Sequence, residues 1–467
     1  AVLGSVFSPK EWRAYFYTSL GVAAVLSAYG LLQLAGVFLI HGGSRPDASF
    51  GNATYFAGYL LLHVFLALFL AARAGASPIV RRTLFVVAGL YALTLFATGT
   101  RGAALGLFVG IVILVAYGVF RLRGKKRIFT LAVFTALLVS PLILFAFRES
   151  RLVSSSSTLN RFASISIGGD DLRGRFIMWG IALKGIAERP FLGWGQENFN
   201  YVFNKHYDAR LEGREEWFDR SHNVFLDYAV DGGILGIIGY LSLFAAAFLA
   251  LWRRFVGWER ATLTALLIAY AAHNFFVFDH LGSYVFFFSL LAYLHGIDAP
   301  TASSQLLRVK KHHTAQPPLG SAFAWVLLIF IAAFFAILAW YTVVRPIRAG
   351  AALINAMTPR SVARVSDSIP FFERAVSPRS FVQSEARTYL ALYAVELTRR
   401  PDFASAPREA INALFMLASR ELDAELRRIP DDARTRYLAG SFLLPYGFYE
   451  NARKQFIAAR ALSSQKP

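Results

Sequence analysis

Residues 219–228 read Asp-Arg-Ser-His-Asn-Val-Phe-Leu-Asp-Tyr, and here a long polar loop enters a long apolar segment. The apolar residues continue to about residue 251, which is enough for a helix to cross a hydrocarbon layer. This boundary predicts that His222 lies at a membrane surface. An imidazole can take up or release a proton there, because its ordinary pKa is about 6.5.

The rest of the chain predicts a membrane protein built from helices. Hydrophobic residues make up 56% of the 467 residues, and many fall in runs long enough to span a bilayer. We therefore expect an all-α fold, a polytopic bundle of about nine transmembrane helices within residues 1–344. The expected helices lie at about 14–40, 55–72, 83–99, 103–120, 128–147, 223–251, 261–278, 282–297 and 321–344.

The net charge of +19 indicates membrane orientation rather than a nucleic-acid partner. Arg and Lys lie mostly in short clusters between apolar runs, and these clusters fall in alternate connections. Basic residues near helix ends prefer the cytoplasm. The pattern predicts that the chain starts in the cytoplasm and that 41–54, 98–102, the large loop 148–222 and the tail 345–467 lie on the outer side.

The sequence gives no sign of a metal or a cofactor. It contains no Cys, which excludes disulfides and a cysteine nucleophile, and neither a His-Glu-x-x-His nor an Asp-x-Asp motif is found. We expect metal-independent chemistry without a cofactor. The chain begins at Ala1 rather than Met, so we also expect the N-terminus to be incomplete.

Arginines at the outer side form one group of candidate binding residues. Arg101 lies in a connection so short that it must be near the interface, and Gly99 and Gly102 leave room beside it for an anion. A planar guanidinium suits a phosphate. The alternative is that Arg101 only extends to lipid headgroups.

Arg173 and Arg175 precede an amphipathic pattern in the large loop. We expect a helix along the membrane or against the bundle, whose N-terminal end favours an anion beside these arginines. The alternative is a solvated basic loop. The expected apolar face comprises Phe176, Ile177, Trp179, Gly180, Leu183 and Ile186.

The histidines form a second group of candidates. His222 is a candidate proton acceptor, with the alternative that it caps a helix through hydrogen bonds to the backbone. His273-Asn274 and Asp279-His280 near the outer end of another helix either form a pocket wall with His222 or satisfy one another. Aromatic residues between 199 and 217 fit an interfacial belt or a sugar-stacking surface.

The composition changes after the last apolar run. Residues 298–320 read as a cytoplasmic linker and 345–360 as a second linker, and 361–467 read as charged, amphipathic, soluble helices. Helix pairs recur at about the 34-residue tetratricopeptide length, so we expect a small α-solenoid of degenerate repeats. Such repeats commonly bind a protein partner.

Several short motifs in a fixed order resemble the O-antigen ligase and O-antigen polymerase superfamily over about residues 14–300. The motifs are Gly99-Thr100-Arg101-Gly102, Gly174-Arg175 with Trp179, Pro190-Phe191-Leu192-Gly193-Trp194-Gly195, and Ser221-His222-Asn223-Val224-Phe225-Leu226 leading to Gly232-Gly233-Ile234-Leu235-Gly236.

The resemblance implies a bacterial plasma-membrane glycosyltransferase that moves a glycan from an undecaprenyl-diphosphate carrier to an acceptor hydroxyl on the outer face. It implies that His222 is the general base and that Arg101 and Arg175 bind the donor diphosphate, because fixed cations stabilise charge developing on a leaving group. Arg173 is a nearby substitute for Arg175, and Arg220 adds to the anion site. The expected supporting residues are Asn223, Trp179 and His273.

The acceptor stays open among a lipid, a growing glycan and a protein. Two other functions also stay open. A transporter for a polyprenyl-linked sugar would need charged groups at mid-membrane depth and internal repeats. A membrane anchor that presents the repeats would need no site, which leaves the polar residues at the outer loop ends unexplained.

Overall fold

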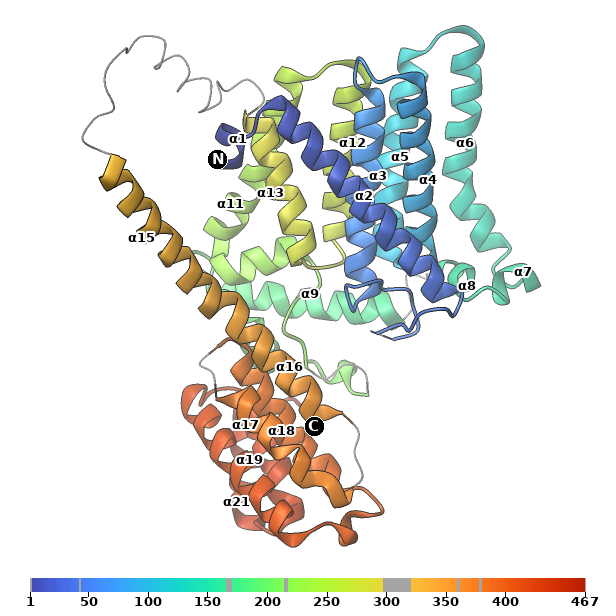
Figure 1. Cartoon of the computed structure of the whole chain (residues 1–467). Helices are drawn as coiled ribbons and strands as arrows, with labels where there is room; N and C mark the ends of the chain where they lie inside the picture. Colours follow the sequence, from blue (N-terminus) through green and yellow to red (C-terminus); the bar gives the residue numbers. More distant parts are fainter. Residues whose placement is uncertain are drawn as a thin grey trace. The chain divides into compact units, whose positions relative to one another are not determined.

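The computed structural model describes residues 2–41, 43–164, 170–213, 217–296, 321–358, 362–377 and 380–466 (Figure 1). Within these ranges every regular element is a helix, so the predicted all-α class is confirmed. The chain divides into two units. Unit 1 comprises Ala1–Phe199 and Asp219–His312, and unit 2 comprises Asn200–Phe218 and His313–Pro467. The expected linker at 298–320 lies outside the described residues.

The described residues include seven helices that are long and apolar enough to cross a membrane, and a helix is present in each of the nine predicted segments. The seven are α2 (Pro9–Leu34), α3 (Ala53–Ala72), α4 (Pro78–Ala97), α5 (Arg101–Arg121), α6 (Gly124–Ala146), α11 (Val224–Arg254) and the continuous stretch Trp325–Met357, which includes most of α15 (Ser321–Ala339). The other two predicted segments form α12 (Gly257–Asn274) and α13 (Leu281–Gly296). The predicted helix 261–278 therefore ends earlier, at Asn274.

The large loop between α6 and α11 also contains helices. They are α7 (Arg151–Ser154), α8 (Ser157–Ala163), α9 (Asp170–Glu188), α10 (Phe199–Lys205) and the 3₁₀ turn η1 (Ala209–Leu211), and a short helix α1 (Val2–Val6) begins the described chain. The predicted helix after Arg175 is thus confirmed. Its predicted apolar face stays a prediction: Phe176 and Leu183 are 51% and 56% exposed, while Met178 and Ala182 are buried with Ile177. An apolar side chain beside lipid need not be buried in protein, so the apolar pattern alone does not identify the packed face.

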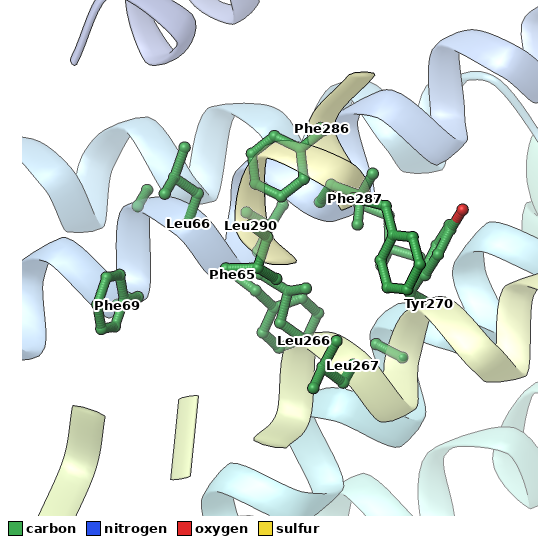
Figure 2. Packing of buried hydrophobic residues seen from close by; sticks show 14 of the residues in the cluster. Phe65, Leu66, Phe69, Leu266, Leu267, Tyr270, Phe286, Phe287 and Leu290 are labelled. Atoms are coloured by element: carbon green, nitrogen blue, oxygen red, sulfur yellow. The ribbon is translucent and has the colours of Figure 1, made fainter. Parts of the chain in front are cut away.

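Helix α3 lies at the centre of unit 1. It packs against α4, α12 and α13, and 78% of its apolar window is buried. Figure 2 shows the core where aromatic and leucine side chains of α3, α12 and α13 meet, with Phe65, Phe287 and Tyr270 among them. This core holds the N-terminal end of α3 and the C-terminal end of α12, beside which the candidate site lies.

Helix α11 is broken at Gly233, whose φ of 61° and ψ of −152° are outside the helical region. The turn at 190–195 docks onto the break. Trp194 N–H donates to Val230 O at 2.8 Å, Gly195 N–H donates to Asp231 O at 2.9 Å, and Ile234 N–H donates to Pro190 O at 2.7 Å. The backbone groups that the break frees are therefore satisfied by the loop, as a membrane helix requires.

Unit 2 includes the last apolar helix, α15, and the helices that follow it. The π-helical turn η2 (Trp340–Val344) joins α15 to α16 (Arg345–Met357), so the expected linker 345–360 contains a helix, and its Leu353 and Ala356 belong to the unit's core. The remaining elements are η3 (Val362–Asp367), α17 (Ile369–Val376), α18 (Val382–Thr398), η4 (Phe403–Ser405), α19 (Arg408–Arg428), α20 (Ala433–Leu443), η5 (Leu444–Tyr446) and α21 (Tyr449–Leu462). Their assignment to tetratricopeptide-like repeats stays a prediction.

Part of the large loop belongs to unit 2. Asn200 Nδ2 donates to Asp432 Oδ1 at 3.1 Å, and the Lys466 ammonium lies 2.9 Å from the centre of the Trp217 ring. The Trp217 ring is also 6.0 Å from the ring of Tyr437. Residues 200–218 of the loop and the C-terminal helices therefore form one packed unit.

A buried ion cluster in unit 2 gives a first prediction. Arg387 is 11% exposed and bonds to Glu421 at 3.0 Å and to Glu425 at 2.9 Å. Arg387→Ala removes the cation that two nearly buried carboxylates share and leaves Glu425 with Arg428 and Glu421 with the exposed Arg420, so we expect the unit to lose up to about 3–5 kcal/mol of stability. Thermal unfolding of the full chain in detergent measures this loss, and unfolding of the C-terminal helices is followed by their proteolysis. Arg420→Ala is the control, because Arg420 is 67% exposed and its bond to Glu421 is worth at most about 1 kcal/mol; equal losses would contradict the prediction.

Candidate functional site

The backbone around His222 is held at the start of α11 by its neighbours. Asn223 Oδ1 accepts hydrogen bonds from the N–H groups of Phe225 at 3.0 Å and Leu226 at 3.2 Å. The Ser221 hydroxyl donates to Asp227 Oδ1 at 2.6 Å, and the Ser221 N–H donates to the same oxygen at 2.7 Å. The helix cap is therefore Asn223, and the His222 side chain is not needed for it.

His222 itself has a left-handed backbone, with a φ of 56°. A non-glycine residue in this region is uncommon and is held there by its surroundings, here by the fixed residues 221 and 223. The imidazole packs against Phe278, with 5.4 Å between ring centres. Burial, and next the charge of Arg175, lower the pKa of His222 to about 4, and Asp219 acts in the opposite direction. His222 is therefore neutral at pH 7 and can accept a proton.

Arg175 reaches the same place from α9. Its Nη1 donates to the carbonyl of Phe276, in the short connection between α12 and α13. Trp179, one turn further along α9, packs with its ring 5.3 Å from that of Phe275 and 6.0 Å from that of Phe276. The side chain of Arg173 is exposed at the start of the same helix.

Arg220 also packs on this connection. Its guanidinium carbon is 5.7 Å from the centre of the Phe278 ring, and it forms an ion pair with Glu197. Glu197 therefore offsets part of the charge of Arg220, whereas the sequence suggests a cation that adds to an anion site. His222 and Arg220 share Phe278 as a packing partner.

Arg101 begins α5 and points towards α8 in the loop. Its Nε donates to Arg161 O at 2.9 Å and its Nη2 donates to Ser164 Oγ at 3.1 Å. The next residue, Gly102, is close to the α12–α13 connection, since a Cβ placed on it would lie 3.4 Å from Phe276 Cβ. Gly102 of α5 and Arg175 of α9 therefore both lie near Phe276, whereas the Arg101 side chain is directed towards α8.

The second pair of polar residues has two separate roles. His273 is 3% exposed and packs between α3 and α5, where a Cβ on Gly58 would lie 2.8 Å from its Nε2. His280 stacks on Tyr55, with ring centres 4.6 Å apart, and Tyr55 also packs against Phe278. Burial lowers the pKa of His280 to about 4. His280 therefore lines the same aromatic group as His222, whereas His273 supports it from within the bundle.

The connection 275–280 joins these residues. Its polar pair Asp279-His280 was predicted as a possible wall of a pocket with His222, but its aromatic run Phe275-Phe276-Val277-Phe278 was predicted to be the end of a membrane helix. The polar pair directly after the run is the signal that could have placed the run outside the helix, because a membrane helix rarely continues into such residues. Within the described residues, no group of three or more His, Asp or Glu side chains is placed to hold a metal ion.

The arrangement places a neutral imidazole next to a fixed cation, Arg175, with Arg101 and Arg220 on neighbouring elements. Fixed guanidinium groups bind phosphate oxygens and favour negative charge that develops during a reaction. A neutral imidazole accepts a proton from a hydroxyl group. The site can therefore bind an anionic group and remove a proton beside it.

Part of the chain matches a known protein family. Residues 84–241 match the family described as O-Antigen ligase. An uncharacterized protein of Haemophilus influenzae is 29% identical over 166 residues, and the aligned segment spans 34% of this chain and 40% of that protein. The family match includes Arg101, Arg173, Arg175, Trp179 and the segment 220–223, and it leaves out His273. Residues 84–241 are thus similar to the O-antigen ligase family.

Proposed function

We propose that the protein is a glycosyltransferase of the ligase or polymerase type. It transfers a glycan from an undecaprenyl-diphosphate carrier to a hydroxyl group of a lipid, glycan or protein acceptor. The observation that carries the proposal is the neutral His222 imidazole beside the Arg175 cation, at the start of a membrane helix.

In the proposed step the acceptor oxygen attacks the anomeric carbon of the donor glycan. A carbon–oxygen bond forms to the acceptor, and the bond between the anomeric carbon and the phosphate oxygen breaks. The electron pair leaves with the carrier diphosphate, and His222 takes the proton of the acceptor hydroxyl. Arg175 and Arg101 stabilise the charge that the diphosphate gains.

Binding of the donor also prepares the base. The lowered pKa of His222 has burial as its main cause and the charge of Arg175 as the next. A diphosphate beside Arg175 offsets that charge, so the pKa of His222 rises when the donor binds. The imidazole then becomes a stronger proton acceptor while it stays mostly neutral near pH 7.

The experiment that tests the proposal is glycan transfer in proteoliposomes loaded with polyprenyl-diphosphate-linked glycan, with a chelator present. We expect Arg175→Ala to lower transfer by about 100-fold or more, because a fixed cation on a developing charge is worth several kcal/mol. Arg173→Ala is the matched control on the same helix, and we expect it to retain most of the activity. The product identifies the acceptor class. Equal activity of wild type and Arg175→Ala would exclude this role of Arg175, and absence of transfer to any acceptor would favour the anchor or the transporter.

We also propose that the large loop and the C-terminal helices lie on the outer side of the bacterial plasma membrane. The alternate basic clusters and the packing of residues 200–218 on the C-terminal helices support this topology. The chain has no Cys, so single cysteines can report the side directly. We expect a membrane-impermeant maleimide to label Arg151→Cys in intact spheroplasts and to label Arg123→Cys only after permeabilisation. The reverse pattern would invert the topology.

A further inference from the structure

We propose that Tyr55, Phe278 and Asp219 form a subsite for the sugar ring that the donor carries directly on its diphosphate. The inference rests on the proposed function, because it names the group that lies between the base and the diphosphate in the proposed step. Tyr55 belongs to the first turn of α3, Phe278 to the connection between α12 and α13, and Asp219 to the segment before α11. Three segments far apart in the sequence thus meet beside His222.

The connection between α12 and α13 determines where this sugar has to lie. Arg175 donates to the carbonyl of Phe276, and the ring of His222 packs on Phe278. Two residues of chain span at most about 7 Å, so the cation and the base contact the connection within the length of about one sugar unit. In the proposed step the diphosphate binds Arg175 and the acceptor hydroxyl binds His222. The sugar that joins them therefore lies over residues 276–278.

Aromatic rings form one wall at this place. The centre of the Tyr55 ring is 6.0 Å from that of Phe278, and the two rings are at 72° to each other. His280 stacks on Tyr55, with ring centres 4.6 Å apart and 22° between the ring planes. These contacts hold the orientation of Tyr55. All three side chains are half-buried, so part of each ring is open to a ligand.

A sugar ring suits such a wall. One face of a pyranose ring presents C–H groups, whose slight positive charge is attracted to the negative face of an aromatic ring. Its hydroxyl groups point outward from the edge of the ring and need hydrogen-bond partners. Ligand sites commonly combine aromatic walls with a few polar groups in this way.

Asp219 supplies a hydrogen-bond acceptor at the edge of the wall. Its side chain is exposed, and it lies close enough to Tyr55 and to His222 for their charges to interact. A carboxylate accepts strong hydrogen bonds from hydroxyl groups. The other two parts of the donor are poor partners for it, because the diphosphate is also negative and the polyprenyl chain is apolar. Asp219 therefore favours the sugar at this place.

Native mass spectrometry of the full chain in a maltoside detergent tests the subsite without an acceptor. The two probes are undecaprenyl diphosphate and undecaprenyl diphosphate that carries one N-acetylhexosamine. We expect Tyr55→Ala and Asp219→Ala each to bind the sugar-bearing probe about tenfold more weakly, because one loses the stacking surface and the other a charge-assisted hydrogen bond. Binding of the bare probe should be unchanged, which also shows that the variants are folded.

Two further variants sharpen the comparison. Tyr55→Phe keeps the ring and loses only the hydroxyl group, so we expect it to retain most of the affinity for the sugar-bearing probe. Tyr17→Ala is the control, because it removes a tyrosine of α2 that is 39% exposed, and we expect it to bind both probes like wild type. Equal weakening of both probes in Tyr55→Ala and Asp219→Ala would assign the wall to the carrier and overturn the subsite.

The failure of the subsite differs from the failure of the proposed function. If wild type binds neither probe, the proposed function fails and the subsite fails with it. If wild type binds both probes and the variants keep wild-type affinity for the sugar-bearing probe, only the subsite is overturned. If Tyr55→Ala does not fold, Asp219→Ala decides the question, because its side chain is exposed.

Discussion

Replacing His222 with alanine is expected to reduce glycan transfer by about 10²- to 10⁴-fold, the usual contribution of a general base. The variant should still fold, because Asn223 caps α11 and Ser221 binds Asp227 without help from the imidazole. His adopts the left-handed backbone more readily than Ala, so the substitution also lowers stability slightly. This effect is small beside the loss of the base. Transfer in proteoliposomes and the thermal unfolding midpoint, measured together, separate the two effects.

The pH dependence of transfer gives an independent check on this role. Transfer needs neutral His222, so it is present above the pKa of His222 and is lost as pH falls through that pKa. Since burial and then Arg175 lower this pKa to about 4, we expect kcat/KM to hold well below pH 6.5. His222→Gln, which keeps a polar side chain but cannot act as a base, should be as inactive as the alanine variant. Normal transfer by His222→Gln would show that His222 is not the general base.

Gly233→Ala is expected to destabilise unit 1 by roughly 3 kcal/mol or more, from backbone strain and from lost hydrogen bonds. A Cβ on Gly233 would lie 2.4 Å from Phe191 O and 2.6 Å from Pro190 O, so the docked turn must move away. The three backbone hydrogen bonds between 190–195 and 230–234 would then be lost. Because α9 and His222 are connected through this turn and through α11, activity should fall as well.

Gly232→Ala is a closely matched control for this substitution. The two glycines are adjacent, but a Cβ on Gly232 meets no atom within 4 Å. Alanine there is expected to leave the unfolding temperature unchanged or to raise it slightly, since alanine favours helix over glycine. Thermal unfolding in detergent compares the two variants, and an equal loss in both would show that the break does not depend on Gly233.

The helices were predictable because a membrane span needs a long apolar run, and such runs are visible in any sequence. The details within these runs were not. Hydropathy is unchanged across Gly233, so the break in α11 has no signal apart from two adjacent glycines. Hydropathy also gave the wrong end for the helix before Asp279, which was predicted to continue through Phe278. Aromatic residues suit both a membrane helix and a connection at its surface.

The candidate site was predictable in its chemistry more than in its geometry. A polar loop that enters an apolar helix pointed to His222, and short basic motifs pointed to Arg175 and Arg101. Which residues pack together depends on contacts between distant segments, such as Arg175 with Phe276 and Arg220 with Glu197. The sequence also could not show that Arg101 is directed towards α8.

The packing of residues 200–218 on the C-terminal helices determines what could be exchanged between related proteins. The C-terminal unit is discontinuous in sequence, since it takes Asn200–Phe218 from the middle of the chain. A graft that moved only the last helices would leave the partners of Trp217 and Asn200 behind, on a surface built to be covered. In a chimera, and equally in recombination between genes, residues 200–218 and the C-terminal helices must therefore come from the same protein.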